Sequence, residues 1–218
     1  MKMKSNLLLS AALALAASSA FASGENISVS FRVIGPGVKP GMLQFTSNGS
    51  PAKVALAPDT RSPVQAYKGP ADIVFRELAP VGKEFAAKLP DTKDLLLLVF
   101  SAPAGGEPKI LVLRDDIDSF PMGSTFFLNS GTVPLGLRFG AQAFDIAPGE
   151  SSLVPPGSSK TSFVQILRDG SSGSDVVFSN NWAASPGQRT IVFLSNDSSE
   201  PPKISVSRIS EGSPPAIK

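Results

Sequence analysis

The stretch Ile27-Ser28-Val29-Ser30-Phe31-Arg32-Val33 decides the fold class, because its apolar and polar residues alternate strictly. Alternation with a period of two is typical of a β-strand with one buried face. Similar short apolar segments follow, separated by Gly, Pro, Asn or Ser: 43–45, 54–56, 64–67, 73–75, 95–100 and 110–113. Short strands at intervals of about ten residues predict an all-β sandwich or barrel, and prolines interrupt most windows in which a helix could form.

The predicted strands occur twice in the same order. Six blocks of the first half resemble blocks of the second half: 54–58 and 144–148, 64–65 and 164–165, 72–75 and 175–178, 85–87 and 182–184, 99–100 and 192–193, and 108–114 and 202–208. Six collinear matches indicate an ancestral duplication.

Each copy has about ninety residues and about seven strands, which is typical of an immunoglobulin-like sandwich. We expect a first β-sandwich repeat over 23–117, a second over 118–210 and a flexible tail over 211–218. The connection between the repeats is short, which predicts that the two halves pack closely. The sequence leaves open the alternative of one larger sandwich built from both repeats.

The first 22 residues predict a secretory signal peptide. Lys2 and Lys4 precede an apolar segment, and Ala20-Phe21-Ala22 fits the small-x-small pattern of a cleavage site. The apolar run is shorter than the roughly 20 residues that span a bilayer, so we expect no membrane insertion after cleavage before Ser23. The chain has no cysteine, which excludes a lipoprotein anchor and predicts a periplasmic or extracellular protein.

Composition excludes several classes of function. The chain has 218 residues, no histidine and no cysteine, so histidine-based triads and thiol chemistry are excluded. The 20 basic and 18 acidic residues include two lysines in the leader, so the mature chain would carry 18 of each. Without a basic excess, we expect no binding to nucleic acid. We predict no catalytic residues, no cofactor-binding residues and no enzymatic activity.

Three acidic residues form a metal-site candidate. Asp115, Asp116 and Asp118 lie within four residues at the joint between the repeats. Carboxylate oxygens suit Ca²⁺, which makes calcium a possible ligand, although a solvated acidic turn explains the same cluster. No other cofactor is expected.

One stretch resembles a group of uncharacterised exported bacterial all-β proteins. The residues are Asp118-Ser119-Phe120-Pro121-Met122-Gly123-Ser124-Thr125-Phe126-Phe127-Leu128-Asn129, followed by Ala147-Pro148-Gly149-Glu150. The resemblance covers mainly the start of the second repeat and implies no activity. The residues themselves predict a Pro-x-Gly turn before one strand and a Pro-Gly turn after another.

Together these features predict an exported, non-enzymatic β-sandwich protein with a structural or interaction role, whose partner is an unknown protein or envelope polymer. A carbohydrate- or polymer-binding module is an alternative, which requires Trp182 or Tyr67 to be exposed. We expect both aromatic residues in the core instead. A periplasmic chaperone-like protein is a second alternative, with 95–100 or 110–113 as its apolar edge strand.

Overall fold

The computed structural model describes residues 26–79, 82–100, 108–183 and 186–212, which form sixteen strands and no helix. The strands are β1 (Asn26–Ile34), β2 (Gly41–Ser47), β3 (Ser50–Leu56), β4 (Gln65–Pro70), β5 (Asp72–Glu77), β6 (Glu84–Lys88), β7 (Asp94–Phe100), β8 (Lys109–Arg114), β9 (Thr125–Asn129), β10 (Leu135–Phe139), β11 (Gln142–Ile146), β12 (Ser151–Val154), β13 (Thr161–Leu167), β14 (Val176–Ala183), β15 (Gln188–Asn196) and β16 (Ile204–Gly212). Within the described ranges, no helix is long and apolar enough to cross a membrane. The predicted signal peptide lies outside these ranges.

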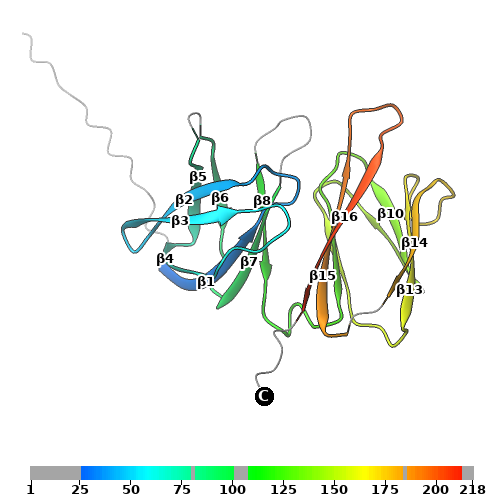
Figure 1. Cartoon of the computed structure of the whole chain (residues 1–218), viewed down its shortest axis with the longest axis horizontal. Helices are drawn as coiled ribbons and strands as arrows, with labels where there is room; N and C mark the ends of the chain where they lie inside the picture. The colour runs from blue at the N-terminus through cyan, green and yellow to red at the C-terminus, as the bar shows by residue number, and fades with distance from the viewer. Residues whose placement is uncertain (1–25, 80–81, 101–107, 184–185, 213–218) are drawn as a thin grey trace, which may run out of the picture.

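Each half of the chain forms one β-sandwich, which confirms the predicted fold class (Figure 1). In the first unit, the sheet β4-β1-β7-β8 packs on the sheet β3-β2-β5-β6. In the second unit, β12-β9-β15-β16 packs on β11-β10-β13-β14. Adding eight to every strand number of the first unit gives the second, so the duplication extends to the whole strand order.

A parallel pair lies in the middle of one sheet of each unit. β1 runs parallel to β7, with Phe31 opposite Leu95, and β9 runs parallel to β15, with Phe127 opposite Val192. The remaining neighbours pair in the antiparallel direction. Each unit therefore has eight strands, one more than the sequence predicts.

Two of the six sequence matches are wrong. Residues 64–65 lie at the start of β4 and 164–165 lie in β13, whose true counterpart is β5. Residues 72–75 lie in β5, whereas 175–178 lie at the start of β14, the counterpart of β6. Short strands with an acidic first residue resemble one another regardless of their place in a sheet. The other four matches join equivalent strands.

Each unit has its own apolar core, and the units also share a third one. The first core contains Phe31, Phe45 and Phe75, and the second contains Phe127, Ile166 and Trp182. The third cluster combines strands of both units: Ile34, Leu96, Leu98 and Phe100 from the first, and Phe126, Leu128, Ile191 and Phe193 from the second, with Phe120 of the connection.

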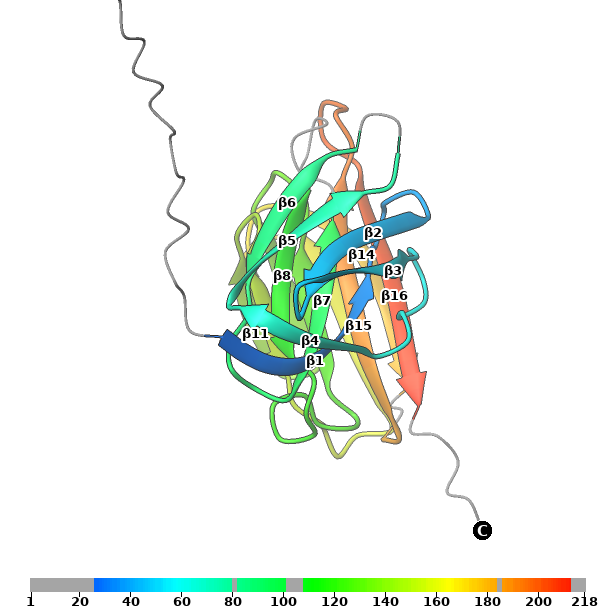
Figure 2. The same ribbon diagram turned by 90° about the vertical axis from the view of Figure 1, so that its left-hand side faces the viewer.

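This third cluster makes the molecule a stack of four sheets. The sheets β4-β1-β7-β8 and β12-β9-β15-β16 face each other in the middle, and we call them the inner sheets; the other two are the outer sheets (Figure 1). Figure 2 looks onto the outer sheet of the first unit, with β2, β3, β5 and β6 in front. The structure thus has two sandwiches and not one larger one, and they pack closely as the short connection predicts.

The motif that resembles exported proteins has an architectural role. The Pro121–Ser124 turn, with Gly123 at φ 82°, precedes β9. The buried Asn129 side chain donates to the carbonyls of Val133 and Ile146 at 2.8 and 2.9 Å. Its backbone carbonyl accepts from the N–H of Gly149 at 2.7 Å, where φ is 81°. Both predicted turns are confirmed, and Asn129 at the end of β9 holds the second turn through these hydrogen bonds.

The last strand is longer than expected. β16 continues through Gly212, so Glu211 and Gly212 belong to a strand and not to the predicted tail. Residues 213–218 of that tail lie outside the described residues.

Candidate functional site

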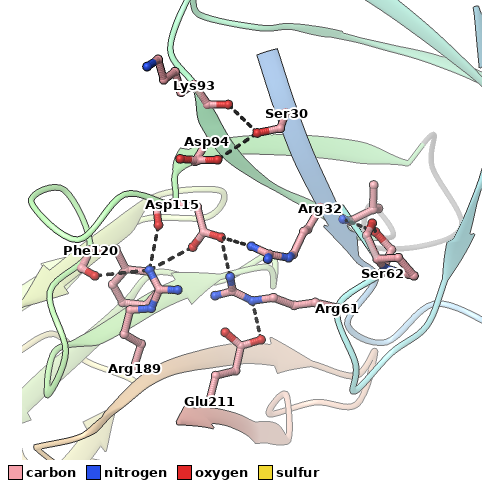
Figure 3. A network of polar contacts seen from close by, with 12 residues as sticks. Ser30, Arg32, Arg61, Ser62, Lys93, Asp94, Asp115, Phe120, Arg189 and Glu211 are labelled. Atoms are coloured by element: carbon pink, nitrogen blue, oxygen red, sulfur yellow. Dashed lines mark hydrogen bonds and ion pairs between the residues drawn. The ribbon is translucent and has the colours of Figure 1, made fainter. Parts of the chain in front are cut away.

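Asp115 lies buried at the joint between the two units, where arginines from both units surround it (Figure 3). Its side chain is only 1% exposed. Arg61 Nη1 is 2.6 Å from Asp115 Oδ2, Arg189 Nη1 is 3.1 Å from Oδ1, and Arg32 Nη1 is 3.4 Å from Oδ2. We call these residues, together with Glu211, the joint network.

Local structure places each member of the first unit. Phe31 and Val33 enter the first core, so the alternation of β1 directs Arg32 toward the other face of the sheet. Arg61 lies in the connection between β3 and β4. This connection is anchored to β1, because Ser62 Oγ accepts a hydrogen bond from the N–H of Val33 at 2.9 Å. The N–H of Ser62 in turn donates to the carbonyl of Val33 at 2.8 Å.

The second unit supplies Arg189 and Glu211. Arg189 Nη1 donates to the backbone carbonyl of Asp115 at 2.9 Å, and its guanidinium lies 5.0 Å from the centre of the Phe120 ring. Glu211 at the end of β16 forms an ion pair with Arg61 Nε. Three arginines and two acids leave this partly buried network with a net charge of +1.

The electrostatics of Glu211 are dominated by its burial. Burial raises the pKa of Glu211 above its ordinary value, and the negative charge of Asp115 acts in the same direction. The cations Arg61 and Arg189 lower it, but less than burial and Asp115 raise it. The close ion pair with Arg61 therefore offsets only part of the cost of burying this carboxylate.

The joint network is a largely buried structural contact between the two units. Arg61 and Arg189 are 9% and 13% exposed at their side chains. Arg61 Nη2 and Arg189 Nε are buried without a hydrogen-bond partner among the described residues. The network links the two units, and none of its residues lines the three pockets described below.

The structure does not bring the three calcium candidates together. Asp115 faces arginines, whereas Asp116 Oδ1 accepts from the N–H of Ser119 at 2.8 Å and Asp116 Oδ2 pairs with Arg114 Nε at 3.1 Å. The hydrogen bond from Ser119 is the main cause of a lowered pKa of Asp116. Asp118 is exposed. Among the described residues, no group of three or more acidic side chains converges as a metal site. Calcium binding stays a prediction that this geometry does not favour.

An apolar pocket lies at one end of the first unit. It has a volume of about 720 Å³ and is lined mainly by apolar residues, including Val38, Met42, Leu56 and Leu78. The loop 35–41 forms one wall, and Val38 N–H donates to the carbonyl of Gly35 in a turn. This glycine-rich loop joins two strands, and no helix follows it.

Two smaller pockets lie in the second unit. One lies between the edge strands β14 and β16, and the other is lined by residues of several strands and of the loop 155–159. They have volumes of about 290 and 280 Å³ and share Trp182, Ala183 and Arg208. The rest of the lining is mixed. Apolar residues contribute Phe178 and Val206 to one pocket, and Phe139, Pro155, Pro156 and Pro186 to the other. Neutral polar residues contribute Asn180 and Asn181 to the first, and Thr125, Ser159, Ser162, Gln188, Thr190 and Ser210 to the second. Of the described residues that line either pocket, only Arg208 is charged.

Trp182 and Tyr67 are both core residues, as expected. Their exposures are 8% and 3%. The Trp182 ring stacks on Phe127 with centres 6.1 Å apart and planes 9° apart, and Arg208 lies 5.1 Å from its centre. Neither aromatic ring offers the open platform that sugar stacking requires.

Sequence reasoning found one functional residue and missed the rest. Asp115 was singled out for its acidic neighbours, but its true partners are 83, 54 and 74 positions away in Arg32, Arg61 and Arg189. Arg208 falls within the block 202–208 that matches 108–114, and the sequence gives no further signal for it.

No protein-family model matches the chain, and no curated protein is similar enough to count as a relative.

Proposed function

We propose that the chain is exported and works, without enzymatic activity, as a structural or interaction protein in the cell envelope or extracellular space. The predicted leader supports export, and the absence of cysteine argues against a lipid anchor. The partner would be an unknown protein or an envelope polymer.

The observation that carries this proposal is the stack of four sheets. Leu96 and Leu98 of β7, together with Ile191 and Phe193 of β15, are at most 3% exposed between the inner sheets. This contact and the joint network fix two sandwiches as one rigid body. Such a body presents two outer sheets and several strand edges in constant positions, which suits a scaffold or adhesive protein.

The two alternatives receive uneven support. The chaperone-like alternative needs an apolar edge strand. Residues 95–100 form the inner strand β7, whereas β8 is an edge strand of its sheet, with its apolar side chains half-buried against the first core and the third cluster. The carbohydrate- or polymer-binding alternative loses its aromatic platform at Trp182 and Tyr67. It gains the polar pockets beside Arg208, which carry the inference below.

Fractionation of cells that express the full sequence tests the proposal. We expect the protein outside the cytoplasm with Ser23 at its N-terminus, as intact mass measurement would show, and bound in part to the envelope fraction. A matched variant with Lys2 and Lys4 replaced by acidic residues should export less efficiently. An unprocessed protein that stays in the cytoplasm would overturn the proposal.

A further inference from the structure

The fold holds the Arg208 guanidinium in place, but no described acidic side chain pairs with it. Among the described residues it forms no ion pair. The alternation of β16 places Arg208 on the same face as Ile204 and Val206, which pack against the second core. Its guanidinium lies over the Trp182 ring at 5.1 Å, and this cation–π contact orients it between the two pockets.

The two units differ in the ion pairing of the equivalent arginines Arg114 and Arg208. Arg114, the counterpart of Arg208, pairs with Asp116 two residues later, at 3.1 Å. The residue two positions after Arg208 is Ser210, whose hydroxyl lies 3.2 Å from that of Thr190. The chain turns at Asp116 in the first unit, whereas β16 continues through Ser210. The duplicated arginine has thus lost its internal carboxylate.

The space around the arginine also differs between the units. In the first unit, β6 contacts β8 directly. In the second unit, one pocket lies between β14 and β16, and a second pocket adjoins Arg208. At this place in the strand order, a pocket and an arginine without an ion pair occur together in the second unit, among the described residues.

We infer that the pockets beside Arg208 bind an acidic saccharide, with a uronic-acid carboxylate on Arg208. This inference rests on the interaction role proposed above and names the class of polymer. A single cation suits one carboxylate per sugar residue, which a guanidinium can bind through two parallel hydrogen bonds. The hydroxyls of Ser162 and Ser210 and the amides of Gln188 and Asn181 match the sugar's neutral hydroxyl groups.

The lining favours a saccharide over two other polymers. Nucleic acid needs several cations along its backbone, and these pockets contain one. An acidic peptide would add as a strand to the free edge of β14 or β16, which requires no pocket of hydroxyl and amide groups. The hydroxyl and amide groups in the mixed lining instead suit a saccharide.

The single tryptophan provides the assay. Trp182 is the only tryptophan of the chain, and it touches both pockets. Titration of the purified wild-type protein with a short oligomer of galacturonic acid should change its fluorescence saturably. The same oligomer with its carboxylates methyl-esterified should bind at least about 10-fold more weakly, because the charge-assisted hydrogen bonds are lost.

Three variants make the test specific. R208Q should weaken binding about 10- to 100-fold, and S210D should weaken it similarly by restoring the internal carboxylate that Arg114 has. R114Q, the matched change in the first unit, should bind like wild type. Calorimetry of R208Q and S210D gives a readout independent of the fluorescence of Trp182.

The inference is overturned if wild type shows no saturable binding, if R208Q binds as well as wild type, or if the esterified oligomer binds equally. Tighter binding of a poly-glutamate peptide than of the saccharide would overturn it in favour of a peptide partner. Because the assay uses purified protein, its failure is distinct from a failure of export, which fractionation alone reports.

Discussion

Replacement of Asp115 by asparagine removes the one charge that all three arginines of the joint network share. The side chain of Asp115 is 1% exposed, and those of Arg61 and Arg189 are 9% and 13% exposed. Water therefore cannot replace the lost carboxylate, and asparagine would also direct an amide donor toward guanidinium donors. Breaking a buried ion pair by removing one partner costs about 3–5 kcal/mol, and we expect D115N to fall in this range.

Thermal and urea unfolding measure the effect. For a chain of this size, each kcal/mol shifts Tm by about 2–4 °C, so D115N should lower Tm by roughly 6–20 °C. R32A is the matched control, because Arg32 also approaches Asp115 but its side chain is 40% exposed. An exposed pair is worth about 0–1 kcal/mol, and R32A should therefore unfold within a few degrees of wild type.

Two outcomes would refute this reasoning. The first is a D115N protein that loses less than about 1 kcal/mol, which would mean that solvent reaches the network. The second is an equal loss in R32A and D115N, which would mean that burial does not decide the strength of these pairs. Calcium gives a separate check: a Tm that rises with added Ca²⁺ in wild type and not in D115N would revive the metal-site hypothesis.

Three further predictions test the packing and the electrostatics. L98A removes a fully buried side chain between the inner sheets and should lower the free energy of unfolding by about 2–5 kcal/mol. The control V74A lies on an outer sheet, where Val74 is 52% exposed, and should change it by less than about 0.5 kcal/mol. Equal losses of stability in the two variants would contradict the shared cluster. Acrylamide should quench the fluorescence of Trp182 weakly, because its side chain is 8% exposed, and efficient quenching would show that the ring is open to solvent. The pKa of Glu211 is raised in the folded protein, so the folded chain holds this proton at pH values where the unfolded chain has released it. The stability of wild type relative to E211Q should therefore fall as pH rises from 4.5 toward neutrality. A relative stability that rises with pH would show that the ion pair with Arg61 outweighs the burial of Glu211.

The sequence predicts the strands well because a strand with one buried face has alternating apolar and polar residues. β1 is the clearest case, with Val29, Phe31 and Val33 in the first core. The continuous run Leu95–Val99 carried a further signal, since Leu95 and Leu97 enter the first core while Leu96 and Leu98 enter the cluster between the units. A strand that is apolar on both faces is covered on both sides. The equivalent run Ile191–Leu194 is also apolar on both faces, so the sequence contains the information that predicts a four-layer stack.

The pairing of charges at the joint was not readable from the sequence. Asp115 meets Arg61 only because Ser62 fixes a connection to β1, and it meets Arg189 only because the inner sheets pack face to face. These contacts depend on tertiary placement, which no local spacing encodes. The acidic run at 115–118 instead suggested a metal site, since neighbours in sequence were the only neighbours known. The two false repeat matches have a similar cause, because local likeness of short strands carries no information on their place in a sheet.

The two candidate sites are opposite faces of the same two strands. On β15, Arg189 and Ile191 face the joint, while Gln188 and Thr190 line a pocket. On β16, the alternation continues: Ile209 and Glu211 face the joint, and Arg208 and Ser210 line the pocket. Because successive side chains point to opposite faces, the sequence can change one site without placing a new side chain in the other. In the first unit, Asp116 pairs with Arg114 and accepts from the N–H of Ser119 in the turn after β8, whereas β16 of the second unit continues past Ser210.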